Sequence, residues 1–257
     1  MIEKLKTAVW FAQRPAFWAH ALELAGRKFR KNLDTPADAD AARRWAASEA
    51  VSVAEAISKV GLPASAAPSA LPGALMSEAR AMAEKSKVRM GGPGDVDLLY
   101  AAATASEATR IVETGVAYGW SSLAILAAIR DRANARLVSV DMPYPKLNNE
   151  QFVGIVVPQS LRPKWELVRE PDRNGLVRAI SILGGEIDLC HYDSDKSYWG
   201  RKFGFDLMWK ALRPGGIFIS DDIQDNLAFK EFVAEKNAPF AVTAYQQKYI
   251  GITRKHG

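Results

Sequence analysis

Acidic side chains stand directly after short apolar segments at several places in the second half of this 257-residue chain. The acidic groups begin with Glu113, Asp141, Glu170, Asp193 and Asp221. Each follows an apolar or β-branched run that is typical of a buried strand. Carboxylates that gather in one place repel one another unless a positive group neutralises them. If these strands lie side by side, the pattern indicates a site for a cationic ligand, a metal ion or both.

A parallel sheet would bring these acidic groups to one edge. After residue 108, short strands alternate with helices, and this order favours a mostly parallel α/β sheet with right-handed crossovers. Ligands of such sheets bind at the carboxyl ends of the strands. We expect strands at residues 110–113, 136–140, 165–169, 187–192 and 216–220, a final strand pair at 239–244 and 248–253, and helices at 121–130, 175–183 and 202–212.

The first 88 residues differ from the rest and are expected to form a helical extension. It begins with a basic arm at residues 1–31, followed by an Ala-rich helix at 35–60. A linker at 61–73 contains three prolines, and a helix is expected at 74–87. Glycines at 91, 92 and 94 then interrupt the chain before a helix at about 95–105. We place the boundary between the extension and the main domain just before these glycines, so that the extension is residues 1–88 and the main domain residues 89–257.

Composition excludes several classes of protein. With 48% apolar residues the chain can bury a core, so it is neither collagen-like nor wholly disordered. The single cysteine, Cys190, excludes an intrachain disulfide and a Cys-based zinc site. It lies mid-strand beside His191, and we expect both to be packed structural residues. Because no apolar run is long enough for a membrane span and no signal peptide is visible, we expect a cytoplasmic protein.

The net charge of +5 is concentrated in the arm at residues 1–31. This segment holds seven basic and two acidic residues, and the rest of the chain is neutral in total. A nucleic-acid partner for the main domain is therefore not expected. The arm also carries Trp10, Phe11, Phe17 and Trp18, and three roles stay open for it: a lid on the site, a contact within a homo-oligomer, or a peripheral contact with an anionic membrane.

A glycine-containing loop links the first strand of the main domain to its helix. Gly115 and Gly119 would let the backbone approach a ligand, and Ser121 could cap the helix. The spacing is neither the dinucleotide-binding G-x-G-x-x-G nor a P-loop. Asp141 follows Gly119 by 22 residues, at the end of the next strand. A carboxylate there can accept hydrogen bonds from both hydroxyls of a ribose.

The segment VETGVAYGWSS and the later LVSVD resemble the first two motifs of class I S-adenosylmethionine-dependent methyltransferases. The resemblance runs from about residue 88 to the C-terminus, and it implies a Rossmann-like, mostly parallel seven-stranded sheet with helices on both faces and the N-terminal helical extension. It implies that Asp141 holds the cofactor's ribose. The other cofactor-binding residues that it implies are Met90, Gly91, Glu113, Gly115, Gly119, Ser121 and, more loosely, Asp172 on the adenine side.

A second segment, IDLCHYDSDKSYWGRKFGFDLMWKALRPGGIFISDDI, resembles the cation-dependent O-methyltransferases of the catechol and caffeoyl-CoA type and a bacterial branch near the macrolide-sugar enzymes. The resemblance implies that Asp193, Asp221 and Asp222 bind a divalent cation. Three oxygen ligands suit Mg²⁺ or Mn²⁺ better than Zn²⁺. It also implies that Lys196 is the general base, although many bacterial members carry His in the matching DSDHSY-like string.

The implied reaction is methyl transfer from S-adenosylmethionine to a hydroxyl of a small molecule or sugar. The cation would lower the pKa of the hydroxyl, and Lys196 and Asp193 would form the catalytic pair. Other interpretations stay open. They are a metal-independent methyltransferase with a structural acidic cluster, an NAD-dependent oxidoreductase, and a non-catalytic membrane-associated scaffold. The lack of G-x-G-x-x-G disfavours the oxidoreductase, and the complete set Asp193, Lys196, Asp221 and Asp222 disfavours the scaffold.

Overall fold

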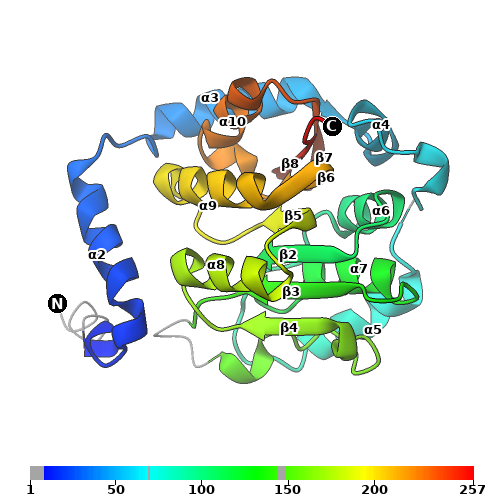
Figure 1. Ribbon diagram of the computed structural model, residues 1–257, viewed down its shortest axis with the longest axis horizontal. Helices are drawn as coiled ribbons and strands as arrows, with labels where there is room; N and C mark the ends of the chain where they lie inside the picture. Colours follow the sequence, from blue (N-terminus) through cyan, green and yellow to red (C-terminus); the bar gives the residue numbers. More distant parts are fainter. Residues whose placement is uncertain (1–8, 69, 144–148) are drawn as a thin grey trace.

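A twisted sheet of eight strands forms the centre of the molecule in the computed structural model, which describes residues 9–68, 70–143 and 149–257 (Figure 1). The strand order is β1-β7-β8-β6-β5-β2-β3-β4. β8 runs antiparallel to both of its neighbours, and the other strand pairs are parallel. The strands are β1 (Ala50–Val51), β2 (Arg110–Thr114), β3 (Arg136–Val140), β4 (Trp165–Val168), β5 (Ile187–Tyr192), β6 (Leu212–Ser220), β7 (Phe240–Tyr245) and β8 (Lys248–Arg254).

The mostly parallel Rossmann-like sheet is thus confirmed, with one strand more than the seven expected. The additional strand, β1, lies in the N-terminal extension, where the sequence predicts one helix over 35–60. The chain forms α3 (Pro36–Glu49), then β1, then α4 (Val53–Lys59). Ser52 begins α4 by accepting a hydrogen bond from the amide of Glu55. Ala50 and Val51 therefore stay extended, and they pair with the edge of β7.

Helices cover both faces of the sheet. One apolar core lies on the side of α4, α6 and α7 and contains Leu99 and Ile125. A second core lies on the side of α8, α9 and α10 and contains Phe205 and Phe229. The remaining helices are α5 (Gly73–Ala83), α6 (Val96–Ala105), α7 (Trp120–Ile129), α8 (Asp172–Ile182), α9 (Tyr198–Ala211) and α10 (Ala228–Lys236). Within the described residues, six short 3-10 helices lie at Pro15–Phe17, Arg27–Phe29, Ala64–Ala66, Glu150–Phe152, Arg162–Lys164 and Ile223–Asp225.

The N-terminal extension joins these cores from α3 onward. Ala46 of α3 belongs to the second core, and Ile57 of α4 belongs to the first. Residues 36–60 are therefore part of the same packed unit as the main domain. The boundary near residue 88 stays a prediction. Among the described residues, none of the helices combines the length and the apolar character needed to cross a bilayer.

The basic arm contributes α2 (Trp18–Gly26), which contains no buried residue. It stands beside the end of the sheet toward which β4 points, drawn in blue at the left of Figure 1. Ion pairs attach it there: Arg27 contacts Asp195 at 2.6 Å, and Arg173 of α8 contacts Glu23 at 2.9 Å. Residues 1–8 of the arm, including Lys4 and Lys6, lie outside the described residues.

Candidate active site

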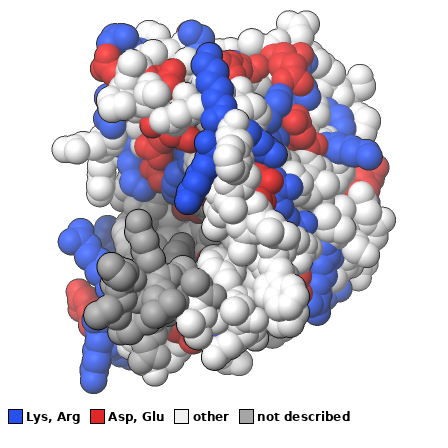
Figure 2. Space-filling model, turned by 90° about the vertical axis from the view of Figure 1, so that its left-hand side faces the viewer, with Lys and Arg blue, Asp and Glu red and all other residues white. Residues whose placement is uncertain are grey.

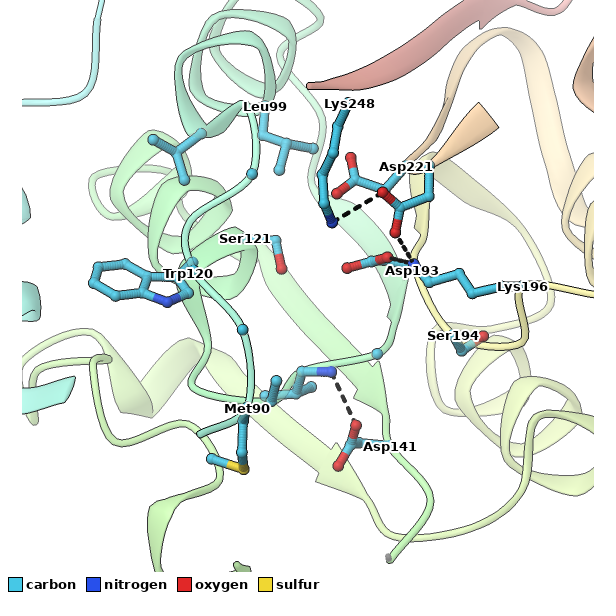
Figure 3. A pocket seen from close by; sticks show the side chains of 18 residues that line it. Met90, Leu99, Trp120, Ser121, Asp141, Asp193, Ser194, Lys196, Asp221 and Lys248 are labelled. Atoms are coloured by element: carbon cyan, nitrogen blue, oxygen red, sulfur yellow. Dashed lines mark hydrogen bonds and ion pairs between the residues drawn. The ribbon is translucent and has the colours of Figure 1, made fainter. Parts of the chain in front are cut away.

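A cavity of about 230 Å³ opens at the carboxyl ends of β2, β3, β5 and β6 (Figure 3). The acidic strand ends therefore converge, as the sequence predicts for a parallel sheet. Most of the residues predicted for the site line this cavity. They are Met90, Gly91, Gly115, Ser121, Asp141, Asp193, Lys196, Asp221 and Asp222.

Gly115 lies where the loops after β2 and β5 meet. Its φ is +78°, a conformation that residues with a Cβ rarely adopt. A Cβ at this position would stand 2.1 Å from the carbonyl oxygen of Asp193. The glycine thus lets two strand ends approach each other, and it forms part of the cavity wall at the same time.

Glu113 and Gly119 do not line this cavity. Glu113 is fully buried, and its carboxylate accepts hydrogen bonds from the hydroxyls of Ser122 at 2.5 Å and Ser139 at 2.6 Å. Its side chain thus lies beneath the site, because it points into the layer between the sheet and α7 and not along the strand end. Gly119, with a φ of +92°, begins α7 and packs against Gly154 and Val157.

Asp141 lies at the end of β3 with 4% of its surface exposed. One carboxylate oxygen accepts a hydrogen bond from the amide of Val116 at 3.0 Å, and the other forms an ion pair with Arg169. Burial raises the pKa of Asp141, although the amide and Arg169 oppose this effect. The carboxylate of Asp141, which is predicted to bind the ribose, is therefore fixed in the cavity wall. Arg169 is already bound to it and would compete with a ribose.

Asp172 lines a second cavity of about 210 Å³, which adjoins the first through Gly115, Asp141 and Ser194. His20 and Leu24 of α2 form the outer wall of this second cavity. Asp172 accepts a hydrogen bond from the Ser194 hydroxyl at 2.5 Å. Burial raises the pKa of Asp172 to about 6.

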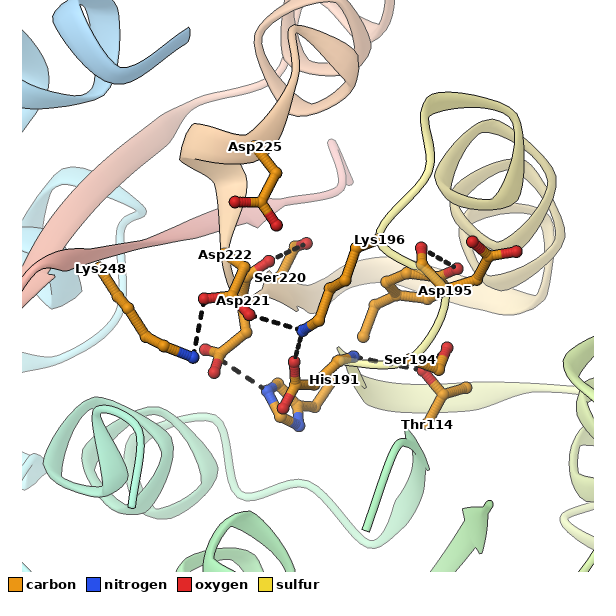
Figure 4. A network of polar contacts seen from close by, with 12 residues as sticks. Thr114, His191, Ser194, Asp195, Lys196, Ser220, Asp221, Asp222, Asp225 and Lys248 are labelled. Carbon is orange, nitrogen blue, oxygen red and sulfur yellow. Dashed lines mark hydrogen bonds and ion pairs between the residues drawn. The ribbon is translucent and has the colours of Figure 1, made fainter. Parts of the chain in front are cut away.

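Two lysines occupy the acidic cluster at the ends of β5 and β6 (Figure 4). The Lys196 ammonium group forms an ion pair with Asp193 and lies 2.7 Å from Asp222 Oδ2. The Lys248 ammonium group lies 2.9 Å from Asp222 Oδ1. Asp222 thus stands between two positive charges, with a φ of +53° that turns its carboxylate toward them. Viewed from outside, basic and acidic side chains crowd together over the upper half of this face (Figure 2).

This pairing argues against Lys196 as the general base. Burial alone would lower the pKa of Lys196, but the charges of Asp193 and Asp222 outweigh it and raise the pKa above its ordinary value. The group is therefore held in its protonated form. Asp193 behaves differently, because burial raises its pKa to about 6 against the opposing charge of Lys196.

His191 of β5 lies beneath the cluster and is fully buried, as is Cys190, so both are the packed residues that the sequence predicts. The His191 ring lies between two carboxylates, with Nδ1 at 3.6 Å from Glu113 and Nε2 at 3.8 Å from Asp221. Burial disfavours its charged form, but these carboxylates outweigh burial and raise the pKa of His191 to about 10. It therefore adds a positive charge below Asp221.

Asp193, Asp221 and Asp222 do not offer a divalent-metal site in this arrangement. Asp193 and Asp222 are bonded to lysines, and Asp221 lies between His191 and Gly94, where a Cβ would be 2.9 Å from its Oδ2. In the part of the chain that the structure describes, no group of three or more His, Cys, Asp or Glu side chains is arranged to hold a metal ion. The Mg²⁺ or Mn²⁺ expected from the sequence is not supported by this geometry.

Lys248, Trp120 and Arg201 belong to the site or support it, although none of them is among the site residues predicted from the sequence. Lys248 begins a strand far along the chain, so only its spacing from the end of β6 could have indicated it. The buried Nε1 of Trp120 has no hydrogen-bond partner among the described residues, and its ring lines the first cavity. Arg201 is fully buried and donates hydrogen bonds to the carbonyls of Lys196 and Asp222.

The comparisons with known proteins agree with this geometry. Residues 112–223, which include most of the strand ends of the cavity, match a family model described as a methyltransferase domain. The resemblance to class I methyltransferases that the sequence indicates is thereby confirmed. No curated protein sequence matches the chain.

Solved structures share the fold of this chain at low sequence identity. Cofactor-bound Rv0187 from MTB superimposes with a TM-score of 0.57 and 17% identity, over 72% of this chain and 91% of that one. An O-methyltransferase from Bacillus cereus in complex with SAH superimposes with a TM-score of 0.56 and 16% identity, over 82% of this chain and 100% of that one. A third structure is the O-methyltransferase TomG from Streptomyces achromogenes, which is involved in tomaymycin synthesis and is in complex with SAM. It superimposes with a TM-score of 0.55 and 19% identity, over 80% of this chain and 96% of that one.

Proposed function

We propose that the protein is an S-adenosylmethionine-dependent O-methyltransferase that acts on a hydroxyl group of a small molecule or sugar. One observation carries the proposal: within a methyltransferase domain, the Gly115 turn, Asp141 and the charged cluster at Asp193 line a single cavity. The solved structures with this fold that contain SAM or SAH support the choice of cofactor.

The two adjoining cavities suit the two ends of this cofactor. Asp141, which lines both, would accept the ribose hydroxyls, and Asp172 in the second cavity would accept from the adenine amino group. Met90 and Gly91 would lie against the methionine part in the first cavity. The unpaired Nε1 of Trp120 there would donate to its carboxylate, which would satisfy a buried polar atom. A bound ribose would either share the Asp141 carboxylate with Arg169 or displace Arg169 from it.

The chemistry requires an acceptor oxygen, an activated methyl group and a place for one proton. The sulfonium of the cofactor supplies a methyl group that leaves with the C–S bond electrons remaining on sulfur. The acceptor oxygen forms the new O–C bond and loses its proton. The protein contributes chiefly by holding the oxygen close to the methyl carbon, at about 3 Å. No step uses a divalent cation, because two of its three expected ligands, Asp193 and Asp222, form ion pairs with lysines.

Asp193 is the proton acceptor that the geometry favours. Its carboxylate lines the first cavity beside Lys196, and its pKa of about 6 leaves it ionised at neutral pH while keeping it basic enough to accept a proton. Lys196 would then act as a fixed positive charge that stabilises the acceptor oxygen as negative charge develops there.

We propose that the arm acts as a lid, because His20 and Leu24 of α2 wall the second cavity. A contact within a homo-oligomer and a peripheral membrane contact remain the competing roles. Sedimentation of the protein and flotation with anionic liposomes test them. A monomer that does not float supports the lid, whereas flotation that is lost in a variant without residues 1–31 supports the membrane contact.

Calorimetric titration with S-adenosylmethionine and with NAD tests the proposed function. We expect heat of binding with S-adenosylmethionine and none with NAD. Asp141→Ala should weaken the binding of S-adenosylmethionine by about tenfold or more, since it removes an acceptor for the ribose hydroxyls. Asp131→Ala is the matched control, because Asp131 is an exposed aspartate outside both cavities. Absence of binding by the wild type would overturn the proposal, and binding of NAD instead would favour an oxidoreductase.

A further inference from the structure

Each of the three carboxylates that line the first cavity at the ends of β5 and β6 faces a positive side chain. Asp193, Asp221 and Asp222 supply the negative charges. Lys196, Lys248 and the buried His191 lie against them, at contacts of 2.7 Å and 2.9 Å for the lysines on Asp222 and 3.8 Å for His191 on Asp221. A divalent cation would therefore meet carboxylates that already have positive partners, and the nearby ammonium groups would repel it.

Lys248 differs from Lys196 in its position. Lys196 bridges two carboxylates, Asp193 and Asp222, whereas the ion pair of Lys248 within the described residues is with Asp222 alone. An ammonium group has three donors, so Lys248 keeps donors for a ligand. Its side chain is half exposed and descends from the start of β8 into the cavity beside Asp221 (Figure 3).

The fold fixes Lys248 at this place. Gly251 of β8 pairs with Ser220 at the end of β6, so Lys248, three residues earlier, extends past the strand end that carries Asp221 and Asp222. The side chain of Gln224, which follows this strand end, accepts a hydrogen bond from the amide of Tyr249 at 2.8 Å and ties the start of β8 to it. The lysine is thus built into the cavity rim by the antiparallel strand pair.

We propose that Lys248 takes the place of a divalent cation at this site, and that its ammonium group binds the acceptor oxygen during methyl transfer. The lysine contributes one positive charge, and its donors hold the oxygen as its proton leaves for Asp193. The O–C bond then forms while the C–S bond breaks. The protein accordingly needs no Mg²⁺ or Mn²⁺ at these carboxylates. The catalytic part of this inference rests on the proposed function, but the exclusion of the cation does not.

Binding of Mn²⁺ to the protein, measured by electron paramagnetic resonance, tests the inference without an acceptor. We expect no Mn²⁺ bound by the wild type at millimolar concentration. Lys248→Met keeps the length of the side chain but removes the charge, so its affinity for Mn²⁺ should rise by at least about 100-fold, enough to make binding detectable at a concentration where the wild type binds none. The same substitution combined with Asp222→Asn should lose this binding. Lys230→Met is the matched control, because Lys230 is an exposed lysine outside the cavity, and it should behave as the wild type.

Two results would overturn the inference. One is Mn²⁺ binding by the wild type that Asp222→Asn abolishes, and the other is a folded Lys248→Met variant that binds no more Mn²⁺ than the wild type. Lys248→Arg, which keeps the charge, should stay free of Mn²⁺, and Mn²⁺ binding by it would count against the inference too. S-adenosylmethionine binding is measured on the same samples. If the cofactor binds and Mn²⁺ also binds to the wild type, only the inference fails. If the cofactor does not bind, the proposed function fails.

Discussion

At the scale of single residues, burial and neighbouring charges shift the pKa values of the carboxyl groups in the site, and these shifts set their protonation states. Asp222 stays ionised because two lysines neutralise it, and burial raises its pKa less than these charges lower it. Asp172 has the opposite tendency, because burial dominates there and raises its pKa to about 6. Residue types and strand-end positions indicated most of these groups in advance. The pairing that keeps Asp222 ionised includes Lys248, which the sequence could not place beside it.

Gly115→Ala should destabilise the protein strongly. The added Cβ would collide with the Asp193 carbonyl at 2.1 Å, and the φ of +78° would be strained in alanine. We expect a loss of more than about 2 kcal/mol in the free energy of unfolding, measured with urea. Gly184→Ala is the control with a similar φ of +85° and nothing within 4 Å of the added Cβ. Equal losses in the two variants would contradict the proposed close approach of the two strand ends.

Asp172→Asn should change how stability depends on pH. The folded pKa of Asp172 is about 6, above its ordinary value of 3.8, so the folded state binds a proton more strongly than the unfolded chain. Its contribution to stability is therefore greatest below pH 4 and falls as the pH rises from about 4 to 6. Asparagine removes this fall, which amounts to up to about 3 kcal/mol. Urea unfolding of both proteins at pH 4, 5, 6 and 7 measures it, and parallel curves would contradict the assignment.

At the scale of elements, the two loops that carry the charged cluster are held together by α9. The fully buried Arg201 donates to the Lys196 carbonyl at 3.2 Å and to the Asp222 carbonyl at 2.8 Å. The start of α9 was expected at residue 202. It lies at Tyr198, because Ser197 caps the helix by accepting from the Gly200 amide. This earlier start brings Arg201 inside. Sequence periodicity located the strands well, but it could not show that a charged residue at a helix start would be buried.

Arg201→Met should release these two loops. It leaves two carbonyl oxygens without their buried donor, so we expect a loss of about 2–4 kcal/mol in stability and weaker binding of S-adenosylmethionine. Lys202→Met, at the neighbouring position, removes only surface ion pairs, with Glu235 and Asp206, and should cost less than about 1 kcal/mol. Unfolding and calorimetry measure both effects. A variant at Arg201 with the stability and affinity of the Lys202 variant would contradict the role given to α9.

At the scale of the whole molecule, the N-terminal arm packs against the main domain at the carboxyl ends of the parallel strands. The alternating strands and helices of the domain were predictable, because local apolar runs of characteristic length determine them. The eighth strand and the docking of α2 were not, because each depends on contacts between segments far apart in the sequence. The excess charge of the arm was visible in the composition. Its pairing of Arg27 with Asp195 and of Glu23 with Arg173 required the fold.

Arg27→Ala should loosen α2. Because α2 contains no buried residue, its ion pairs are a main part of its attachment to the domain. We expect faster amide hydrogen exchange over residues 18–26, with the exchange of β2 and β5 unchanged. Lys28→Ala, a change at a neighbouring exposed lysine, should leave the exchange of α2 as in the wild type. Unaltered exchange in the Arg27 variant would mean that other contacts hold the arm.

A crystal structure of the protein with S-adenosylhomocysteine tests the central claim most directly. We predict the sulfur atom in the first cavity near Gly115, the ribose hydroxyls on the Asp141 carboxylate, and the adenine ring in the second cavity between Asp172 and α2. Lys248 should still contact Asp222, with no metal ion between the carboxylates when Mg²⁺ is present in the crystals. A cofactor bound outside both cavities, or with its ribose away from Asp141, would contradict the account.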